Sequence, residues 1–233
     1  MIIKLLKKFL HRLGYVVYKL KPEIYPIELY GKHASILKKS QSFIKKITSK
    51  YPQTVISPYQ EGYKVTISSY SYYITSAEEL FILKEIWVDD CYNFDSNRAC
   101  VVIDIGMNVG IASLHFASKN NVSKVYSYEP VTPTFKQGIV NFDLNKALKT
   151  KIEAYNFGLG IKNETLQLTF NPNYKGSVGK TKATSIIQDG KNNQTVTAEI
   201  RDIEPIFLSI ISDHADESLI LKQTILEYAT SVS

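Results

Sequence analysis

The sequence has few cysteines and lacks any long apolar run. Its 233 residues include two cysteines, Cys91 and Cys100. Two are too few for a disulfide framework and fit a reducing compartment, although one bridge between them stays open. No stretch reaches the roughly 18–20 apolar residues that a membrane-spanning helix needs. Residues 1–20 contain neither the charge-free apolar core nor the small-residue cleavage site of a secretory signal. We therefore expect a cytoplasmic protein.

Excess positive charge is missing from most of the chain. The formal net charge is +6, but residues 1–50 hold twelve Lys and Arg against two acids, whereas residues 51–233 hold sixteen against twenty. A nucleic-acid enzyme carries its basic patch beside its site, so we expect no nucleic-acid partner. A hydrophobic share of 44% is enough to bury a core and excludes a disordered or collagen-like chain.

The basic N-terminal segment is predicted to be helical. Residues 2–17 place apolar side chains at helical spacing with Lys, His and Arg between them. Such a helix over residues 1–20 would contact an anionic surface, here the inner face of the membrane, or a partner protein. The plainer alternative is a helix that packs on the domain itself. A second helix is expected over residues 34–50.

A hairpin and a capped helix are expected next. Residues 63–75 are rich in Tyr, Val, Ile and Thr, which is typical of strands. Ser76 and Glu79 have the capping-box spacing, so a helix is expected to begin there. Its predicted buried residues are Leu80, Phe81, Leu83 and Ile86.

From residue 99 the pattern alternates between strands and helices. Strands are predicted over residues 99–105, 124–128 and 152–157, with helices over 111–120 and from Thr132 onward. Thr132 is the expected N-cap, with Pro133 at the first helical position. The predicted inner face of that helix is Phe135, Ile139, Val140, Phe142 and Leu144. This order indicates an α/β fold with a doubly wound, Rossmann-like parallel sheet.

The rest of the chain predicts a hairpin, a helix and one more strand. The hairpin strands are expected over residues 165–170 and 194–200, the helix over 203–211 and the strand over 219–221. We divide the chain into a basic helical extension (1–60), a hairpin and helix (61–98), a partial core (99–222) and a tail (223–233).

The candidate site lies in the turn at residues 106–110, within the sequence V-I-D-I-G-M-N-V-G of residues 102–110. A glycine at the carboxyl end of a first parallel strand, here Gly106, lets the chain turn tightly and lets a ligand approach the backbone. Glu129 ends the second strand, so it is expected beside that turn, where a carboxylate accepts ribose hydroxyl protons. Asp104 within the strand is expected to order the loop or to meet a cofactor ammonium.

The glycine spacing differs from that of a dinucleotide site. The second motif position, where pyrophosphate approaches the backbone, is Asn108, and the third would be Ile111 rather than Gly110. The spacing therefore does not fit a pyrophosphate, whereas Glu129 still fits the ribose of an adenosine. This pattern favours S-adenosylmethionine, an adenosine cofactor without phosphates. A nicotinamide-dependent oxidoreductase is the weaker alternative, and no metal centre is expected.

These motifs together resemble the FkbM-type S-adenosylmethionine-dependent methyltransferases. The resemblance covers roughly residues 60–222 and rests on segments 79–86, 92–94, 101–110, 126–130 and 156–160. It implies a class I methyltransferase fold and O-methylation of a hydroxyl on a sugar, glycan or related metabolite, as in polysaccharide biosynthesis. It also implies that Gly106, Asn108 and Gly110 form the cofactor loop, that Glu129 binds the ribose, and that residues around Asn156 border the adenine.

No catalytic residue is identified from the sequence. The four histidines, His11, His33, His115 and His214, lie in no motif and are interpreted as surface or packing residues. The segment Asn171–Tyr174 is similar to the N-P-P-Y element of amino-methyltransferases acting on flipped bases. It follows a hairpin-like strand rather than a parallel one, so we expect a polar turn.

The sequence departs from the family after Lys222. Family members continue with K-x-D-x-E-G, whereas here the lysine is followed by Gln-Thr-Ile-Leu-Glu. We expect a truncated or frame-disrupted product. The alternative function is accordingly a degenerate methyltransferase fold that binds the cofactor without turnover.

Overall fold

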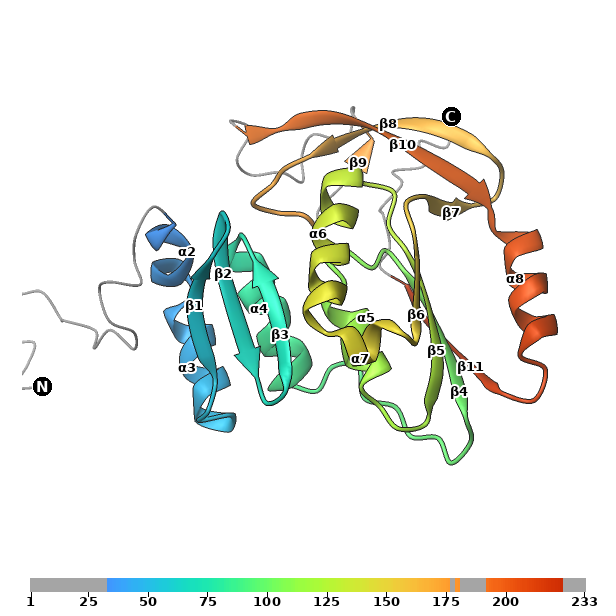
Figure 1. Ribbon diagram of the computed structural model, residues 1–233. Helices are drawn as coiled ribbons and strands as arrows, with labels where there is room; N and C mark the ends of the chain where they lie inside the picture. Colours follow the sequence, from blue (N-terminus) through green and yellow to red (C-terminus); the bar gives the residue numbers. More distant parts are fainter. Residues whose placement is uncertain (1–32, 177–178, 181–191, 224–233) are drawn as a thin grey trace, which may run out of the picture.

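The computed structural model describes residues 33–176, 179–180 and 192–223 (Figure 1). The predicted helix over residues 2–17, and with it the proposed surface contact of residues 1–20, lies outside the described residues. The described strands form three sheets, with orders β1-β2-β3, β7-β10-β8-β9 and β11-β4-β5-β6. Within the described residues, no helix is both long enough and apolar enough to cross a bilayer.

The first sheet packs with three helices. The helix expected over residues 34–50 is divided at Ser40 into α2 (Ala34–Lys39) and α3 (Gln41–Lys50). Strands β1 (Val55–Tyr59), β2 (Gly62–Ile67) and β3 (Tyr70–Ile74) pair antiparallel. The hairpin is as predicted, whereas β1 was not foreseen. Their buried side chains share one apolar cluster with those of α4 (Ala77–Trp87) and of the parallel sheet.

Helix α4 begins at the predicted cap. The Ser76 hydroxyl accepts a hydrogen bond from the Glu79 backbone N–H at 3.4 Å, and the Glu79 carboxylate accepts one from the Thr75 N–H at 2.7 Å. Three of the four predicted inward residues are buried: Leu80, Leu83 and Ile86. The prediction for Phe81 is wrong, because its side chain is 37% exposed on the face of α4 that lines a pocket.

The central sheet is parallel throughout, as predicted. Its strands are β4 (Cys100–Ile105), β5 (Val122–Tyr128), β6 (Ile152–Tyr155) and β11 (Ser218–Gln223). Alternate residues face opposite sides. Val102 joins the cluster that contains α5 (Ile111–Ala117), and Val101 and Ile103 join the cluster of α8 (Ile203–Asp213). This mixed α/β arrangement is compatible with a Rossmann-like fold.

Helix α6 (Thr132–Leu144) differs most from its prediction, and α7 (Lys146–Lys149) follows it. Val131 is the N-cap rather than Thr132, whose hydroxyl instead donates to the Asn156 side chain at 2.8 Å. The buried face is mainly polar. Of the predicted apolar face only Phe142 is buried, while Phe135, Ile139, Val140 and Leu144 are partly exposed.

The polar face of α6 caps the edge of β3. The Asn141 side-chain oxygen accepts from the Tyr73 N–H at 2.6 Å, and the Gln137 amide donates to the Tyr73 carbonyl at 3.1 Å. The Asn145 amide donates to the Ser71 carbonyl at 2.6 Å. An edge strand has unpaired backbone groups, so amide side chains are more useful here than the apolar face that periodicity predicts.

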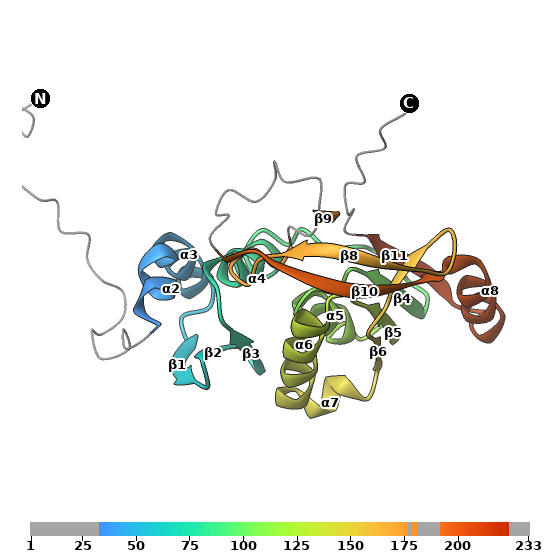
Figure 2. The same ribbon diagram turned by 90° about the horizontal axis from the view of Figure 1, so that it is seen from above.

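The third sheet lies across the carboxyl ends of the parallel strands (Figures 1 and 2). It consists of β7 (Gly158–Gly160), β8 (Glu164–Phe170), β9 (Gly179–Lys180) and β10 (Gln194–Asp202). The predicted antiparallel pairing of β8 with β10 is confirmed, as are the helix and strand that follow. The sheet therefore covers the end of the core where the candidate turn lies.

Candidate functional site

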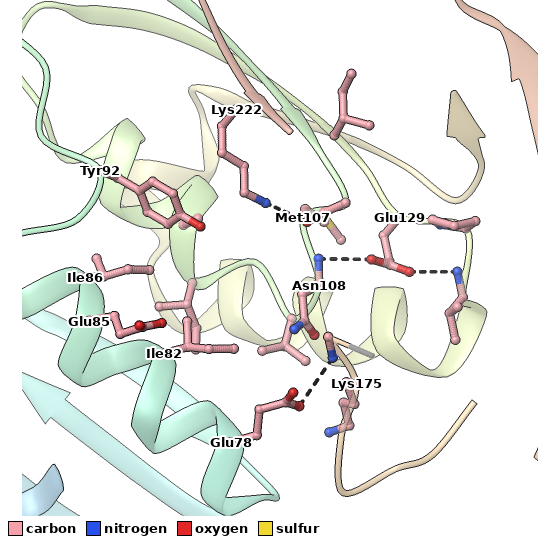
Figure 3. A pocket seen from close by; sticks show the side chains of 18 of the residues that line it. Glu78, Ile82, Glu85, Ile86, Tyr92, Met107, Asn108, Glu129, Lys175 and Lys222 are labelled. Atoms are coloured by element: carbon pink, nitrogen blue, oxygen red, sulfur yellow. Dashed lines mark hydrogen bonds between the residues drawn. The ribbon is translucent and has the colours of Figure 1, made fainter. Parts of the chain in front are cut away.

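A pocket of about 300 Å³ opens at the carboxyl ends of β4 and β5. Its walls come from α4, from the loop after β4, from the end of β5 and from β7 and β10 (Figure 3). The predicted site residues Gly106, Asn108 and Glu129 line it, whereas Asp104, Gly110 and Asn156 do not.

The loop after β4 depends on glycine at two places. Gly106 and Gly110 have φ of 75° and 76°, and Asn108 between them has φ of 53°. All three are in the left-handed region, which glycine and, less readily, asparagine adopt. A Cβ at Gly110 would also lie 2.6 Å from the Phe142 ring. Gly110 thus serves packing and backbone shape behind the pocket.

Four of the five N–H groups of this loop have acceptors within the protein. Those of Gly106 and Met107 donate to the Tyr128 carbonyl, that of Asn108 to the Glu129 carboxylate, and that of Gly110 to the Met107 carbonyl. A phosphate-binding loop instead directs several backbone N–H groups at its ligand. The geometry therefore agrees with the inference from glycine spacing that this turn does not cradle a pyrophosphate.

Glu129 is a buried carboxylate at the pocket wall, with 6% of its surface exposed. One oxygen accepts from the Asn108 N–H at 3.0 Å and the other from the Val131 N–H at 2.9 Å (Figure 3). Burial raises the pKa of Glu129 to about 7, although the two backbone hydrogen bonds act in the opposite direction. Each carboxylate oxygen can accept more than one hydrogen bond, so this group retains capacity for hydroxyl donors in the pocket.

Asp104 acts on the loop from beneath rather than on the pocket. It is fully buried, its carboxylate accepts from the Ser113 hydroxyl at 2.6 Å, and it pairs with the Lys222 ammonium at 2.7 Å. Lys222 also donates to the Gly106 carbonyl at 2.7 Å and lines the pocket. The predicted loop-ordering role fits this position, and the ammonium that Asp104 meets is that of Lys222. The lysine stood out in the sequence only as the last residue matching the family pattern.

Asn156 joins the ends of two strands. Its amide donates to the Glu129 carbonyl at 2.9 Å, and its oxygen accepts from Thr132. The neighbouring Gly158 and Leu159 line the pocket in its place.

The α4 wall carries residues that were not predicted as part of the site. Residues 78, 81, 82, 85 and 86 lie on one helical face, and Figure 3 shows Glu78 and Glu85 directed toward the pocket across from Glu129. Burial raises the pKa of Glu78, and the Gly176 N–H donates to its carboxylate at 3.3 Å. The i, i+3, i+4, i+7 spacing was visible in the sequence, but nothing there indicated which face meets a ligand.

The remaining candidates fall outside the pocket. Asn171 closes a turn on the Asn173 N–H at 2.9 Å, which confirms the polar turn expected there. His115 is buried with neither ring nitrogen hydrogen-bonded, and His214 contacts Tyr126 and Glu217. Within the described ranges, no group of three or more His, Cys, Asp or Glu side chains is placed to hold a metal.

Curated relatives match part of the chain. Methyltransferase sdnD from Sordaria araneosa is 37% identical over 111 residues, which are 46% of this chain and 42% of that protein. Methyltransferase 1 from Beauveria bassiana is 30% identical over 131 residues, 54% of this chain and 49% of that protein. The AMB antimetabolite synthetase AmbE from Pseudomonas aeruginosa is 28% identical over 100 residues, 42% of this chain and 5% of that protein.

The chain spans about half the length of the two methyltransferases that it matches. No protein-family profile and no solved structure matches it. The similarity to proteins named methyltransferase supports a relationship to methyltransferases.

Proposed function

We propose that this protein is an S-adenosylmethionine-dependent methyltransferase of the FkbM type that transfers a methyl group to a hydroxyl of a glycan or related metabolite. The main support is Glu129, a buried carboxylate that faces the pocket beside a glycine loop whose named N–H groups are already bonded. The similarity to two proteins named methyltransferase supports the same reaction class.

The residues present fit this cofactor. Glu129 would accept the ribose hydroxyls, and the apolar Val131 and Leu159 beside it would contact the adenine. Among the described residues, two lysines line the pocket, and each is paired with an acid: Lys175 with Glu79 and Lys222 with Asp104. A pyrophosphate would therefore meet paired lysines and, at residues 106, 107, 108 and 110, loop N–H groups that already have acceptors. This arrangement argues against the nicotinamide alternative.

The chain's own residues would bind, orient and exclude water. When bound, the cofactor supplies the reactive methyl group on its sulfonium. The protein must then hold an acceptor oxygen in line, and positioning alone accounts for a large part of such a rate. Glu78 and Glu85 are carboxylates in the α4 wall. The raised pKa of Glu78 makes it the better candidate to receive the hydroxyl proton.

Residues 1–20 are proposed to contact an anionic membrane surface or a partner protein, and the site to act in the cytoplasm. Cofactor binding without turnover remains the alternative function.

Calorimetric titration of the purified full chain with S-adenosylhomocysteine tests the proposal. We expect the wild type to bind. In Glu129→Ala the binding free energy should be weaker by roughly 1.5–3 kcal/mol, the usual size for hydrogen bonds to a charge. The matched control is Glu204→Ala, which removes an exposed carboxylate on α8. This variant should bind as the wild type does. Absence of wild-type binding would refute the cofactor assignment. Binding without methyl transfer to any of a panel of hydroxylated acceptors would favour the alternative.

A further inference from the structure

A buried lysine connects the third sheet to α4. Lys175 follows the turn after β8, yet its ammonium lies at the start of α4, nearly 100 residues earlier in the chain. It pairs with the Glu79 carboxylate at 2.6 Å and donates to the Thr75 hydroxyl at 2.6 Å and to the Gln137 side-chain oxygen. The Lys175 side chain is 6% exposed and that of Glu79 is fully buried.

The hydrogen-bonding groups in this cluster are matched. An ammonium has three protons to donate, and Lys175 has three acceptors. The other Glu79 oxygen accepts from the Thr75 N–H and from the Gln137 amide at 3.0 Å. A buried charge pair is retained without large cost only when its remaining groups are also hydrogen-bonded. This cluster meets that condition and therefore specifies where the segment lies.

The same segment forms part of the pocket wall. Lys175 and Gly176 line the pocket, and the Gly176 N–H donates to Glu78, the residue next to Glu79. A Cβ at Gly176 would lie 3.2 Å from Glu78 and 3.7 Å from the Asn108 amide. Gly176 is thus held between α4 and the loop after β4, the two walls that flank the cavity.

We propose that Lys175 is a positioning residue for this site. By pairing with Glu79 it holds Gly176 against Glu78, and so completes the α4 wall on which ligand affinity depends. The inference rests on the proposed function, since it takes the occupant to be S-adenosylmethionine or its product.

The test compares S-adenosylhomocysteine affinity with folding stability in three full-length variants. Lys175→Met leaves a buried carboxylate without its cation, so it should both destabilise the fold and raise Kd about tenfold. The double variant Lys175→Met, Glu79→Gln removes both charges and should regain most of the stability while Kd stays high, because Met cannot hold the segment. Lys84→Met is the matched control. Lys84 is also buried and is paired with Asp89, but it does not line the pocket. The Kd of Lys84→Met for S-adenosylhomocysteine should therefore equal that of the wild type.

Two results would overturn this proposal and leave the cofactor assignment unaffected. If Kd returns to the wild-type value together with stability in the double variant, the ion pair serves folding alone. If Lys175→Met binds as tightly as the wild type at a temperature where it is folded, the segment has no part in the site. Failure of the wild type to bind is a different outcome, which overturns the cofactor assignment and this inference together.

Discussion

Ligand affinity should depend on pH through Glu129. Burial raises the pKa of this carboxyl group from its ordinary value of 4.5 to about 7, so near neutrality a large fraction of the ligand-free protein carries it protonated. Ribose hydroxyls that donate to the carboxylate would favour the ionised form. Binding would therefore lower the pKa and release a proton.

The size of this pH dependence follows from the difference between the ordinary pKa of a glutamate, 4.5, and the pKa of about 7 in the folded protein. At about 1.4 kcal/mol for each pKa unit, the rise from 4.5 to about 7 means that the folded protein disfavours the ionised form of Glu129 by about 3–4 kcal/mol relative to the unfolded chain. Affinity should be constant above about pH 8 and should weaken toward tenfold per pH unit below about pH 7. The folding stability of the ligand-free protein changes with pH in the opposite direction to ligand affinity. Because the folded-state pKa lies above the unfolded-state value, the contribution of Glu129 is fully present below about pH 4.5 and is lost as the pH rises through about 7.

Calorimetric titration with S-adenosylhomocysteine between pH 5.5 and 8.5 measures this dependence. Repeating it in two buffers of different ionisation enthalpy counts the protons released. 5′-Methylthioadenosine, which keeps the ribose but lacks the amino-acid part, should show the same profile, and Glu129→Gln should show none. A wild-type Kd that does not change between pH 5.5 and 8 would refute the reasoning.

Two further predictions concern stability. Lys222→Met leaves the fully buried Asp104 without its cation, so urea denaturation should show a loss of about 3–5 kcal/mol; a loss below about 1 kcal/mol would contradict the pairing. Burial lowers the pKa of His115 to about 4. This is below its unfolded value of 6.5, so the contribution of neutral His115 is present above about pH 6.5 and is lost as the pH falls toward 4. His115→Phe should remove that part of the pH dependence of the melting temperature, and parallel profiles for the two proteins would exclude the burial argument.

Much of the fold was predictable because its signals are local. The apolar run that forms β4 indicates a strand buried on both faces, and Ser76 with Glu79 places the start of α4 within one turn. The glycine loop and Glu129 follow from strand ends that a parallel sheet brings side by side.

Other elements could not be read in this way. The inner face of α6 was expected to be apolar by periodicity, but Gln137, Asn141 and Asn145 are buried there because the edge of β3 needs hydrogen-bond partners. Whether an amide is buried depends on what it meets, and β3 lies more than 60 residues earlier in the chain.

The pocket wall likewise combines features that the local sequence predicts with features that depend on tertiary contacts. The sequence by itself determined the loop of residues 106–110 and the acid at its side, because turn geometry is set by neighbouring residues and consecutive parallel strands joined by a helix usually lie side by side. Only the tertiary structure placed Lys175 on Glu79 and Lys222 on Asp104, residues 96 and 118 positions apart. A lysine has the same local signature at the surface and in a buried pair. Its partner is decided when the sheets pack, because only then is water removed and a matching set of acceptors required.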